Sequence, residues 1–329
     1  MYSTFLPMGT RLYTITRNTF VHTIRQPIYS VIIVISLLLF MLAPSISLYT
    51  LDEDVKLLRE LGLSTLFLAG LFIAIFSATG AVTEEIETGT ITTVLSKPVP
   101  RPVFVLGKFG GVAAAVCLAH YINTVAFVLA VRHGVLTTAS DYPDWPVITA
   151  AASVVFLAIL ASALLNYFYD WNFPASAVLL GALFAAFAVV LLLFVDRDWN
   201  ITPSALETFS LFDLYASLLL LFGIFIIIAL AVLFSARFNV VMTLTCCVSV
   251  FLFGLISDWV FGRLAGHPWL AKIGSALIPN MQVFWVSDAI YETGKIPPIY
   301  LAMGLSYAAC YTLGILALSV ALFQRRQVG

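Results

Sequence analysis

The chain has 329 residues, of which 61% are hydrophobic and only 10% are charged, and its net charge is -1 at pH 7. Soluble domains usually carry about 25% charged residues, so this composition excludes a water-exposed globular enzyme. It also lacks the basic blocks that would indicate a nucleic-acid partner. The four cysteines fall inside apolar stretches without a CxxC pair, which favours free thiols that pack as small apolar groups.

Long stretches of the chain contain no Asp, Glu, Lys or Arg. Each is near or above the roughly 20 residues that cross a bilayer as a helix. Lipid offers no hydrogen-bond partners to the backbone, so helix is the expected conformation, and the alternating pattern of a β-barrel is absent. The sequence therefore predicts an all-α integral membrane protein, a polytopic bundle of about eight transmembrane helices in a single domain over residues 1–329. These stretches are 28–51, 61–83, 109–131, 145–169, 171–195, 214–236, 238–257 and 296–324.

The residues before the first apolar stretch predict an interfacial helix over 8–26, which would lie in the membrane plane with its basic face towards the headgroups. An ordinary cytoplasmic helix is the alternative. About 27 mostly polar residues are too many for the n-region of a signal peptide, so we expect the first span to be retained. The polar face consists of Arg11, Thr14, Asn18, His22 and Arg25, and the apolar side of Leu12, Tyr13, Phe20 and Ile24.

The orientation follows from the basic residues near the span ends. Arg25 precedes the first span, and Arg325 and Arg326 follow the last. We therefore expect a multi-pass protein of the inner (plasma) membrane with both termini in the cytoplasm. Residues 170–174 predict a very short turn between two antiparallel spans. Residues 263–298 predict amphipathic or partly re-entrant helices at the outer surface, with an aromatic belt formed by Trp269, Phe284 and Trp285.

The segment between the second and third spans is rich in charge. Glu84, Glu85 and Glu87 predict the start of a short helix, where acidic side chains favour the positive end of the helix dipole. Three prolines forbid its continuation, and two basic residues flank the next span. A rigid charged element attached to two membrane helices can transmit a push from a soluble partner, although a solvated connector remains open. These later residues are Pro98, Pro100, Pro102, Arg101 and Lys108.

Three motifs occur in order in this segment: Glu84-Glu85-Ile86-Glu87-Thr88-Gly89-Thr90, Leu95-Ser96-Lys97-Pro98-Val99-Pro100-Arg101 and Gly107-Lys108. They resemble the coupling segment of ABC transporter permeases of the second exporter type (ABC-2). The resemblance implies that residues 84–101 form a cytoplasmic coupling helix that docks on an ATPase subunit. It also implies a six-span core, to which spans 145–169 and 171–195 would add an extra hairpin. The implied coupling residues are Glu84, Glu85, Glu87, Thr88, Gly89, Thr90, Lys97, Pro98, Arg101 and Lys108.

The chain itself has no nucleotide-binding motif. In a P-loop the lysine follows the pattern GxxxxGK[ST], but Phe109 follows Lys108 here and Pro102 stands where the first glycine would be. The resemblance therefore implies a permease subunit of an ATP-driven exporter without its own catalytic site, cofactor or metal. ATP and Mg²⁺ would be bound by two copies of a separate ATPase subunit. A second permease copy, or a similar chain, would complete the membrane part.

The third span also carries small and polar residues. Gly107, Gly111, Ala115 and Ala119 are spaced four apart, which allows close helix packing or a place in a dimer interface or the transport pathway. His120 and Asn123 lie near the middle of the span, where they either bond to a neighbouring helix or line the pathway. Asp213 and Asp258 are predicted to be solvated caps near span ends.

Other function classes remain as alternatives. An ATP-independent secondary transporter would favour inverted repeats and ionisable residues at mid-membrane, and neither is evident. A non-transporting membrane scaffold or assembly factor would lack an ATPase partner. A membrane enzyme would need a catalytic cluster at depth, for which His120 and Asn123 do not suffice. The substrate is not identified by the sequence, although apolar and small polar residues suit lipids, hydrophobic peptides or drugs.

Overall fold

The computed structural model describes residues 7–47, 54–87, 100–136, 141–202, 209–263, 268–286, 290 and 295–324. Over these residues the chain is all-α, as the sequence predicts, and the described part contains no β-structure beyond one isolated bridge between Val195 and Ile201. The helices are α1 (Met8–Arg25), α2 (Pro27–Ser47), α3 (Asp54–Glu87), α5 (Arg101–His133), α6 (Trp145–Tyr169), α7 (Phe173–Leu192), α8 (Leu211–Ser235), α9 (Val240–Leu255), α10 (Ser257–Arg263), α11 (Pro268–Leu277) and α13 (Pro298–Gln324), with a 3-10 turn η3 (Gln282–Phe284).

Seven of these helices are long and apolar enough to cross a membrane, and α9 with α10 forms an eighth candidate that is bent by 60°. This confirms the prediction of about eight spans but corrects the interval 238–257, which is not one straight helix. At 1.5 Å per residue the 16 residues of α9 extend over about 24 Å, which is less than the ~30 Å of the hydrocarbon core. The chain therefore needs further residues to complete this crossing.

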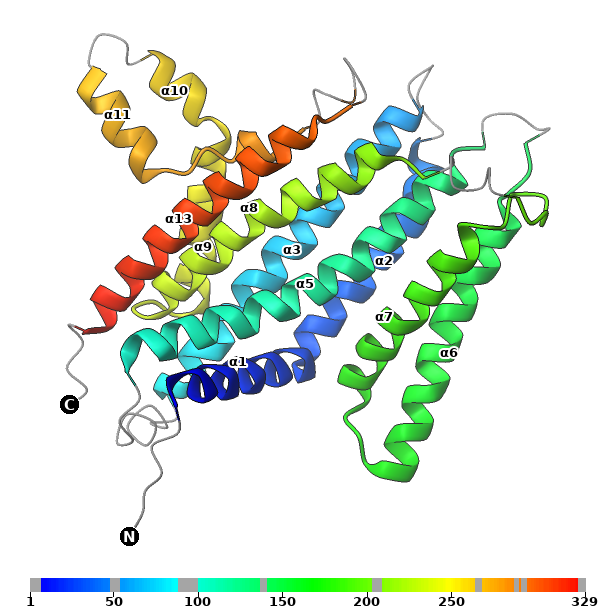
Figure 1. Cartoon of the computed structure of the whole chain (residues 1–329), viewed down its shortest axis with the longest axis horizontal. Coiled ribbons are helices and arrows are strands. Elements are labelled where there is room, and N and C mark those ends of the chain that lie inside the picture. Colours follow the sequence, from blue (N-terminus) through cyan, green and yellow to red (C-terminus); the bar gives the residue numbers. More distant parts are fainter. Residues whose placement is uncertain are drawn as a thin grey trace.

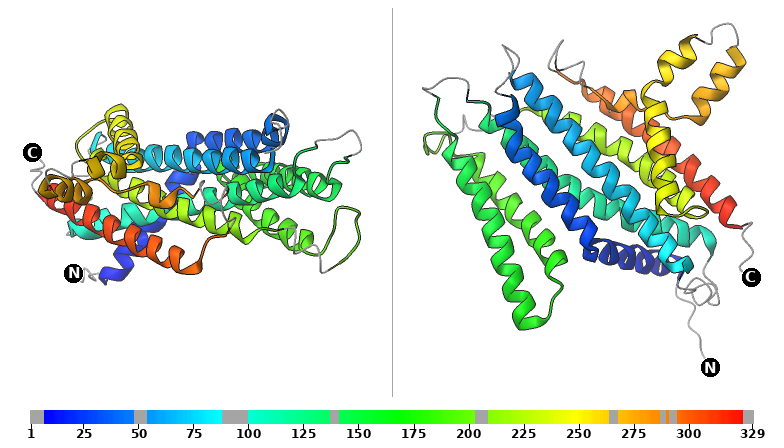
Figure 2. Two further views of the ribbon diagram at one scale, coloured as in Figure 1. Left: turned by 90° about the horizontal axis from the view of Figure 1, so that it is seen from above. Right: turned by 180° about the vertical axis from the view of Figure 1, so that it is seen from behind.

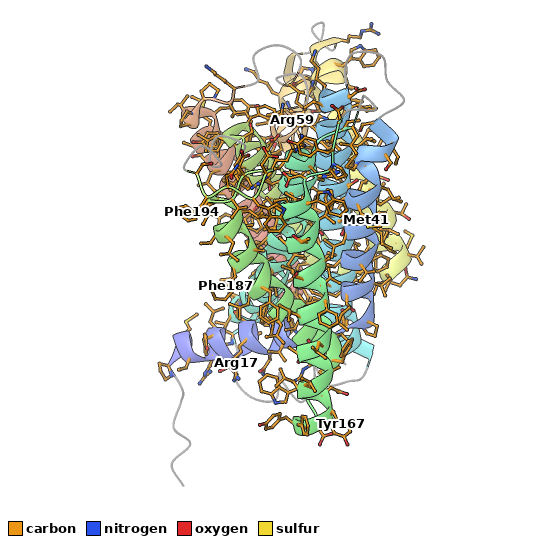
Figure 3. The ribbon with its side chains drawn as sticks, turned by 90° about the vertical axis from the view of Figure 1, so that its right-hand side faces the viewer. Arg17, Met41, Arg59, Tyr167, Phe187 and Phe194 are labelled. Carbon is orange, nitrogen blue, oxygen red and sulfur yellow. The ribbon has the colours of Figure 1, made fainter. Side chains whose placement is uncertain are left out.

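Helix α1 lies across one end of the bundle, which we call the α1 end (Figure 1). The last residues of α13 and the turn between α6 and α7 lie at this same end. Figure 2 shows the α6–α7 hairpin at one edge of the bundle, beside the helices of the core. Helix α8 lies at the centre of the core, because 72% of its membrane-spanning stretch is buried. In α6, at the edge, only 17% of the membrane-spanning stretch is buried. Seen from the side, Arg17 lies at the α1 end and Arg59 at the opposite end (Figure 3).

The turn between α6 and α7 is as short as residues 170–174 predict. Asp170 adopts a left-handed conformation with φ 55°, and its N–H donates to the carbonyl of Asn166 to close α6. The side chain of Asn172 then accepts from the backbone N–H of Ala175 at 3.1 Å and so caps the start of α7. The two helices must therefore run antiparallel and pack against each other.

Helix α1 packs against the first turns of α5 at two glycines. A Cβ added at Gly111 would lie 2.5 Å from Cβ of Thr19 and 2.6 Å from the carbonyl oxygen of Thr16. A Cβ added at Gly107 would lie 2.6 Å from Cγ2 of Ile15. Such distances are far shorter than carbon contacts allow, so the two backbones approach as closely as they do because these side chains are absent.

The faces of α1 agree with the sequence only in part. Thr14, Asn18, His22 and Arg25 are exposed, as the helical wheel predicts, and Ile24 is buried. Tyr13, which the wheel assigns to the apolar side, is 68% exposed. The reason is that α1 turns the face with Ile15, Thr16 and Thr19 towards α5, so Tyr13 points away from the bundle.

The segment around η3 is built into the bundle and is not a surface belt. Phe284 is 1% exposed and lies against Gly223, which is twelve residues from the start of α8 or about 18 Å along it. Asn280 N donates to the hydroxyl of Tyr307 at 2.7 Å, and Tyr300 donates to the carbonyl of Val283 at 2.8 Å. The predicted role of Phe284 in an interfacial aromatic belt is therefore wrong, because this segment re-enters the core, whereas Trp269 on α11 is 60% exposed.

The glycine contact predicts a marked effect of one added methyl group. Gly111→Ala should lower the free energy of unfolding by about 1–3 kcal/mol, because the new Cβ forces α1 away from α5. Gly314→Ala is the matched control, since nothing lies within 4 Å of a Cβ at that position on α13. SDS-induced unfolding of the purified variants measures the difference. Equal stability of the two variants would contradict the close contact.

Candidate functional site

Helix α3 ends and α5 begins at the α1 end of the bundle (Figure 1), and the predicted coupling segment connects them in the sequence. Helix α3 ends at Glu87, and α5 begins at Arg101 directly after Pro100. The structure therefore places the two helix ends that hold the segment. Thr88, Gly89, Thr90, Lys97 and Pro98 lie outside the described residues, as do the side chains of Glu84, Glu85 and Glu87.

The three acidic residues lie at the end of a helix and not at the start of one. Helix α3 continues unbroken from Asp54 to Glu87 because Glu is a good helix former and no breaker occurs in this stretch. In the last turn the carbonyl end of the helix dipole disfavours each negative charge by roughly 0.3–1 kcal/mol. The stability of α3 therefore gives no reason for three carboxylates here.

Lys108 lies inside the bundle, with a residue exposure of 5%. Its ammonium is 5.5 Å from the ring centre of Phe104, one turn earlier on α5. The ring of Phe104 in turn packs edge-on against Phe323 of α13, with centroids 6.0 Å apart. Lys108 thus lies where α5 meets the end of α13. The sequence alone did not identify the two aromatic residues at this place, Phe104 and Phe323.

His120 connects α5 to α8 within the membrane. Its Nε2 lies 2.9 Å from the hydroxyl and 3.0 Å from the carbonyl oxygen of Ser217. Thr124, one turn further along α5, shares a hydrogen bond of 2.7 Å with the same hydroxyl. His120 and Ser217 are both buried, so these bonds satisfy polar groups that would be costly in lipid.

Asn123 connects α5 to α2 in the same way. The hydroxyl of Ser36 donates to Oδ1 of Asn123 at 2.8 Å, and Asn123 is 1% exposed. Closer to the α1 end, Tyr29 donates to the backbone carbonyl of Ala115 at 2.7 Å. Sequence reasoning found His120 and Asn123 but missed Tyr29, Ser36 and Ser217, although hydroxyl groups in otherwise apolar spans are a signal for such partners.

Asp213 is a buried carboxylate that forms an ion pair with the partly exposed Arg59 at the opposite end of the bundle. Its Oδ1 lies 3.0 Å from Nε of Arg59 on α3, and its side chain is 1% exposed. The prediction of a solvated cap is therefore wrong for Asp213. The physical reason is that Arg59, which is distant in the sequence, brings a compensating charge into the seam between α3 and α8.

A second buried cation fastens the α6–α7 hairpin to the core. Arg132, at the end of α5, pairs with Asp144 at 3.3 Å and donates to the carbonyls of Leu192 and Val195 at 2.5 and 2.6 Å. The side chains of Arg132 and Asp144 are 2% and 3% exposed. Both carbonyls lie at the end of α7, where a helix favours positive charge. One guanidinium therefore joins the ends of α5 and α7 and the start of α6.

Further polar contacts lie around this arginine, outside the spans. Tyr142 donates to Asp198 at 2.9 Å, and this hydrogen bond to a carboxylate raises the pKa of Tyr142. Arg197 donates to the backbone carbonyl of His133 at 2.8 Å. These contacts connect the loop before α6 with the turn after α7.

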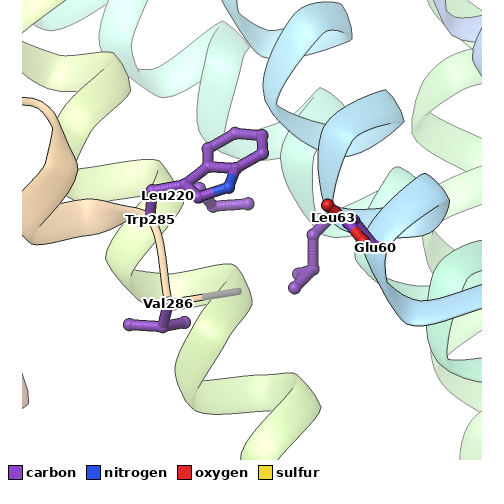
Figure 4. Close-up of a pocket in the computed structure, with 5 residues that line it drawn as sticks. All are labelled: Glu60, Leu63, Leu220, Trp285 and Val286. Carbon is purple, nitrogen blue, oxygen red and sulfur yellow. The ribbon is translucent and has the colours of Figure 1, made fainter. Parts of the chain in front are cut away.

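A small pocket opens between α3, α8 and the segment that follows η3 (Figure 4). The empty space between its walls, including the open mouth, is about 220 Å³. The part of this space that a water-sized group can enter is only about the size of one water molecule. Its walls are Glu60, Leu63, Leu220, Trp285 and Val286. The ring of Trp285 is held edge-on by Phe67, with centroids 5.9 Å apart.

Removal of the buried guanidinium should release the hairpin. Arg132→Met leaves Asp144 as an uncompensated buried charge and two carbonyls without their donor, so we expect the free energy of unfolding to fall by about 3–5 kcal/mol. Arg132→Met with Asp144→Asn should recover part of this loss. Arg197→Met, which removes one hydrogen bond to the backbone and the contact with the ring of Tyr142, serves as the control in SDS-induced unfolding. A loss no larger than that of the control would show that Arg132 does not hold the hairpin.

Comparison with known proteins finds one similar family. Residues 13–167 match a family model described as ABC-2 family transporter protein. No match to a curated protein or to a solved structure was found. The matched region runs from α1 to nearly the end of α6 and includes the entire predicted coupling segment. It supports the resemblance that the motifs of residues 84–108 indicate, and it covers slightly less than half of the 329-residue chain.

Proposed function

We propose that this chain is the membrane-spanning permease subunit of an ATP-driven ABC exporter, and that residues 84–101 couple it to a separate ATPase. The observation that carries the proposal is the position of Glu84, Glu85 and Glu87 in the last turn of α3. A docking partner with basic side chains would offset charges that the helix dipole disfavours. The ABC-2 match over residues 13–167, which includes this turn, supports the same function.

The lengths of the two helices suit this role. Helix α3 has 34 residues and α5 has 33, so each extends over about 50 Å, well beyond the ~30 Å of the hydrocarbon core. Both can therefore reach past the lipid on the side where the coupling segment joins them. A soluble subunit can engage that segment without entering the membrane.

The proposed assembly contains two permease chains, either two copies or this chain with a similar one, above two ATPase subunits. The ATPase subunits bind ATP and Mg²⁺. The α1 end faces the cytoplasm of a cell with this chain in its inner (plasma) membrane, and both termini lie on that side. This orientation is supported by the common end of α1 and α13 and by the basic residues Arg25, Arg325 and Arg326 near the first and last spans.

Closure of the ATPase subunits moves residues 84–101 and tilts α3 and α5. Movement of α5 reaches α1 and α2 directly, because Gly107 and Gly111 lie against α1 while Ala115 and Asn123 are hydrogen-bonded to α2. Movement reaches α8 through the contact of His120 with Ser217. The push therefore enters at one end of α5 and spreads along its length.

The acidic turn of α3 is the point at which to test this function. The double variant Glu84→Ala/Glu87→Ala should retain about one tenth or less of the affinity for the ATPase subunit that co-purifies with the natural chain, because hydrogen bonds to charged groups contribute roughly 1.5–3 kcal/mol each. Co-purification from membranes measures binding, and stimulation of ATP hydrolysis by the permease measures coupling.

Asp54→Ala is the matched control, because Asp54 begins the same helix at its opposite end. It should bind and stimulate the ATPase like the natural chain. If the double variant co-purified with the ATPase and stimulated hydrolysis as well as this control, residues 84–87 would not be the docking site. If no ATPase co-purified with the natural chain, the exporter function itself would be wrong.

A further inference from the structure

The face of α1 that points away from α5 carries positive charge only. The helix contains three arginines and no acidic side chain. Its other face is used by the fold, because Ile15 and Thr19 lie against the glycines of α5. Arg17 and Arg25 are exposed, and neither guanidinium has an ion pair or a hydrogen bond within the part of the chain that the structure describes. The fold therefore leaves these two cations for a partner outside the chain.

The point at which α1 crosses α5 places α1 at the membrane surface. Gly107 and Gly111, where the two backbones meet, lie about 9 and 15 Å along α5 from its start at Arg101. From Gly111 to the other end of α5 at His133 the helix extends over about 33 Å, close to the ~30 Å of the hydrocarbon core. Helix α1 lies across this end of the bundle, with Arg17 upon it (Figures 1 and 3). Its exposed face is therefore at the level of the lipid headgroups.

The connection to α2 gives the same depth at the other end of α1. Only Gln26 separates Arg25 from α2, whose span begins at Pro27. Arg25 therefore lies within one helical turn of the hydrocarbon core. Tyr13, which is 68% exposed, lies one turn before Arg17. A tyrosine beside an arginine suits the headgroup level, where the ring meets acyl chains and the polar end meets water.

We propose that this face of α1 binds the phosphate groups of anionic phospholipids in the leaflet at the α1 end. Guanidinium groups form charge-assisted hydrogen bonds with phosphate, and each basic side chain near an anionic membrane surface raises the affinity about fivefold. Anionic lipid is favoured over zwitterionic lipid, because α1 offers no carboxylate to a choline or an ethanolamine. A soluble protein would meet the first turns of α5 before it met α1, because α5 begins further from the membrane. The proposal does not depend on coupling to an ATPase.

The test uses the full-length chain in phosphatidylcholine nanodiscs, with 5-fluorotryptophan in place of tryptophan. Tyr13→Trp adds one fluorine resonance beside the basic face. A small fraction of the lipid carries a spin label near the headgroup, either on phosphatidylglycerol or on phosphatidylcholine. Labelled phosphatidylglycerol should broaden the added resonance about fivefold more than labelled phosphatidylcholine, because the anionic lipid is enriched at α1.

Trp171 supplies a control site in the same leaflet. It is 56% exposed at the turn between α6 and α7, which lies at the α1 end, and it follows Asp170 without a basic neighbour in the sequence. Trp171→Phe identifies its resonance. The two labelled lipids should broaden this resonance to a similar extent, because no cation of the turn attracts the anionic one.

Two double variants in the Tyr13→Trp chain separate charge from fold. Arg17→Gln/Arg25→Gln should bring the ratio of the two broadenings close to one. Arg17→Lys/Arg25→Lys keeps both charges and should keep most of the preference for phosphatidylglycerol. An unchanged Trp171 resonance shows in each variant that the bundle is folded.

Equal broadening by the two lipids at the added resonance, or a preference that persists in Arg17→Gln/Arg25→Gln, would overturn the proposal. Equal broadening together with loss of ATPase co-purification by the glutamine variant would assign the face to a protein partner in place of lipid. The nanodiscs contain no ATPase, so a failure of ATPase coupling would leave the lipid result standing. A failure of lipid enrichment would equally leave the coupling result standing.

Discussion

The close approach of α1 to α5 at Gly107 and Gly111 is the constraint on which much of the structure depends. Without side chains at these two positions the backbones meet, and α1 can lie across the end of the bundle. Only Gln26 separates α1 from α2, so the place of α1 also sets where α2 begins. Tyr29 and Ser36 of α2 then reach α5 and form hydrogen bonds with Ala115 and Asn123.

Lipid explains why small and polar residues fulfil this role. Apolar side chains are as well solvated by lipid tails as by each other, so helices in a membrane associate through close packing and interhelical hydrogen bonds. The same reasoning accounts for the segment around η3. Its backbone is not α-helical at a depth of about 18 Å along α8, and such backbone requires protein partners. Tyr300, Tyr307 and Gly254 supply them to Val283, Asn280 and Met281.

The spans could be predicted from the sequence because the exclusion of charge over 20 residues is a strong and local signal. The predictions that were wrong concern contacts between residues that are far apart in the chain. Asp213 appears as a solvated cap until Arg59 is placed beside it, and Phe284 appears as a surface aromatic until Gly223 is placed beneath it. The prediction that the acidic residues begin a new helix was wrong for another reason. An apolar stretch can end before its helix does, because Glu is a good helix former and continues α3.

The candidate site could be predicted only as a set of residues. The motifs identify residues 84–101 and the family match includes them, but neither shows which residues of other helices contact α5. The structure shows these contacts, because His120 is hydrogen-bonded to Ser217 and Asn123 to Ser36. These partners lie on helices whose relative positions no local pattern encodes. Lys108 shows the same limit, because its neighbour Phe104 becomes informative only once Phe323 of α13 is seen beside it.

These contacts join α1, α2 and α5, and the proposed transmission of force from the coupling segment requires the three helices to move as one unit. Spin labels at Arg17 on α1 and Leu106 on α5 report distances within the unit, and labels at Leu106 and Leu313 on α13 report distances across its border. The most direct measurement compares both distances in the complex with the ATPase, before and after ATP binding. We expect an unchanged distance between α1 and α5 and a changed distance between α5 and α13. A shift between α1 and α5 as large as that between α5 and α13 would contradict it.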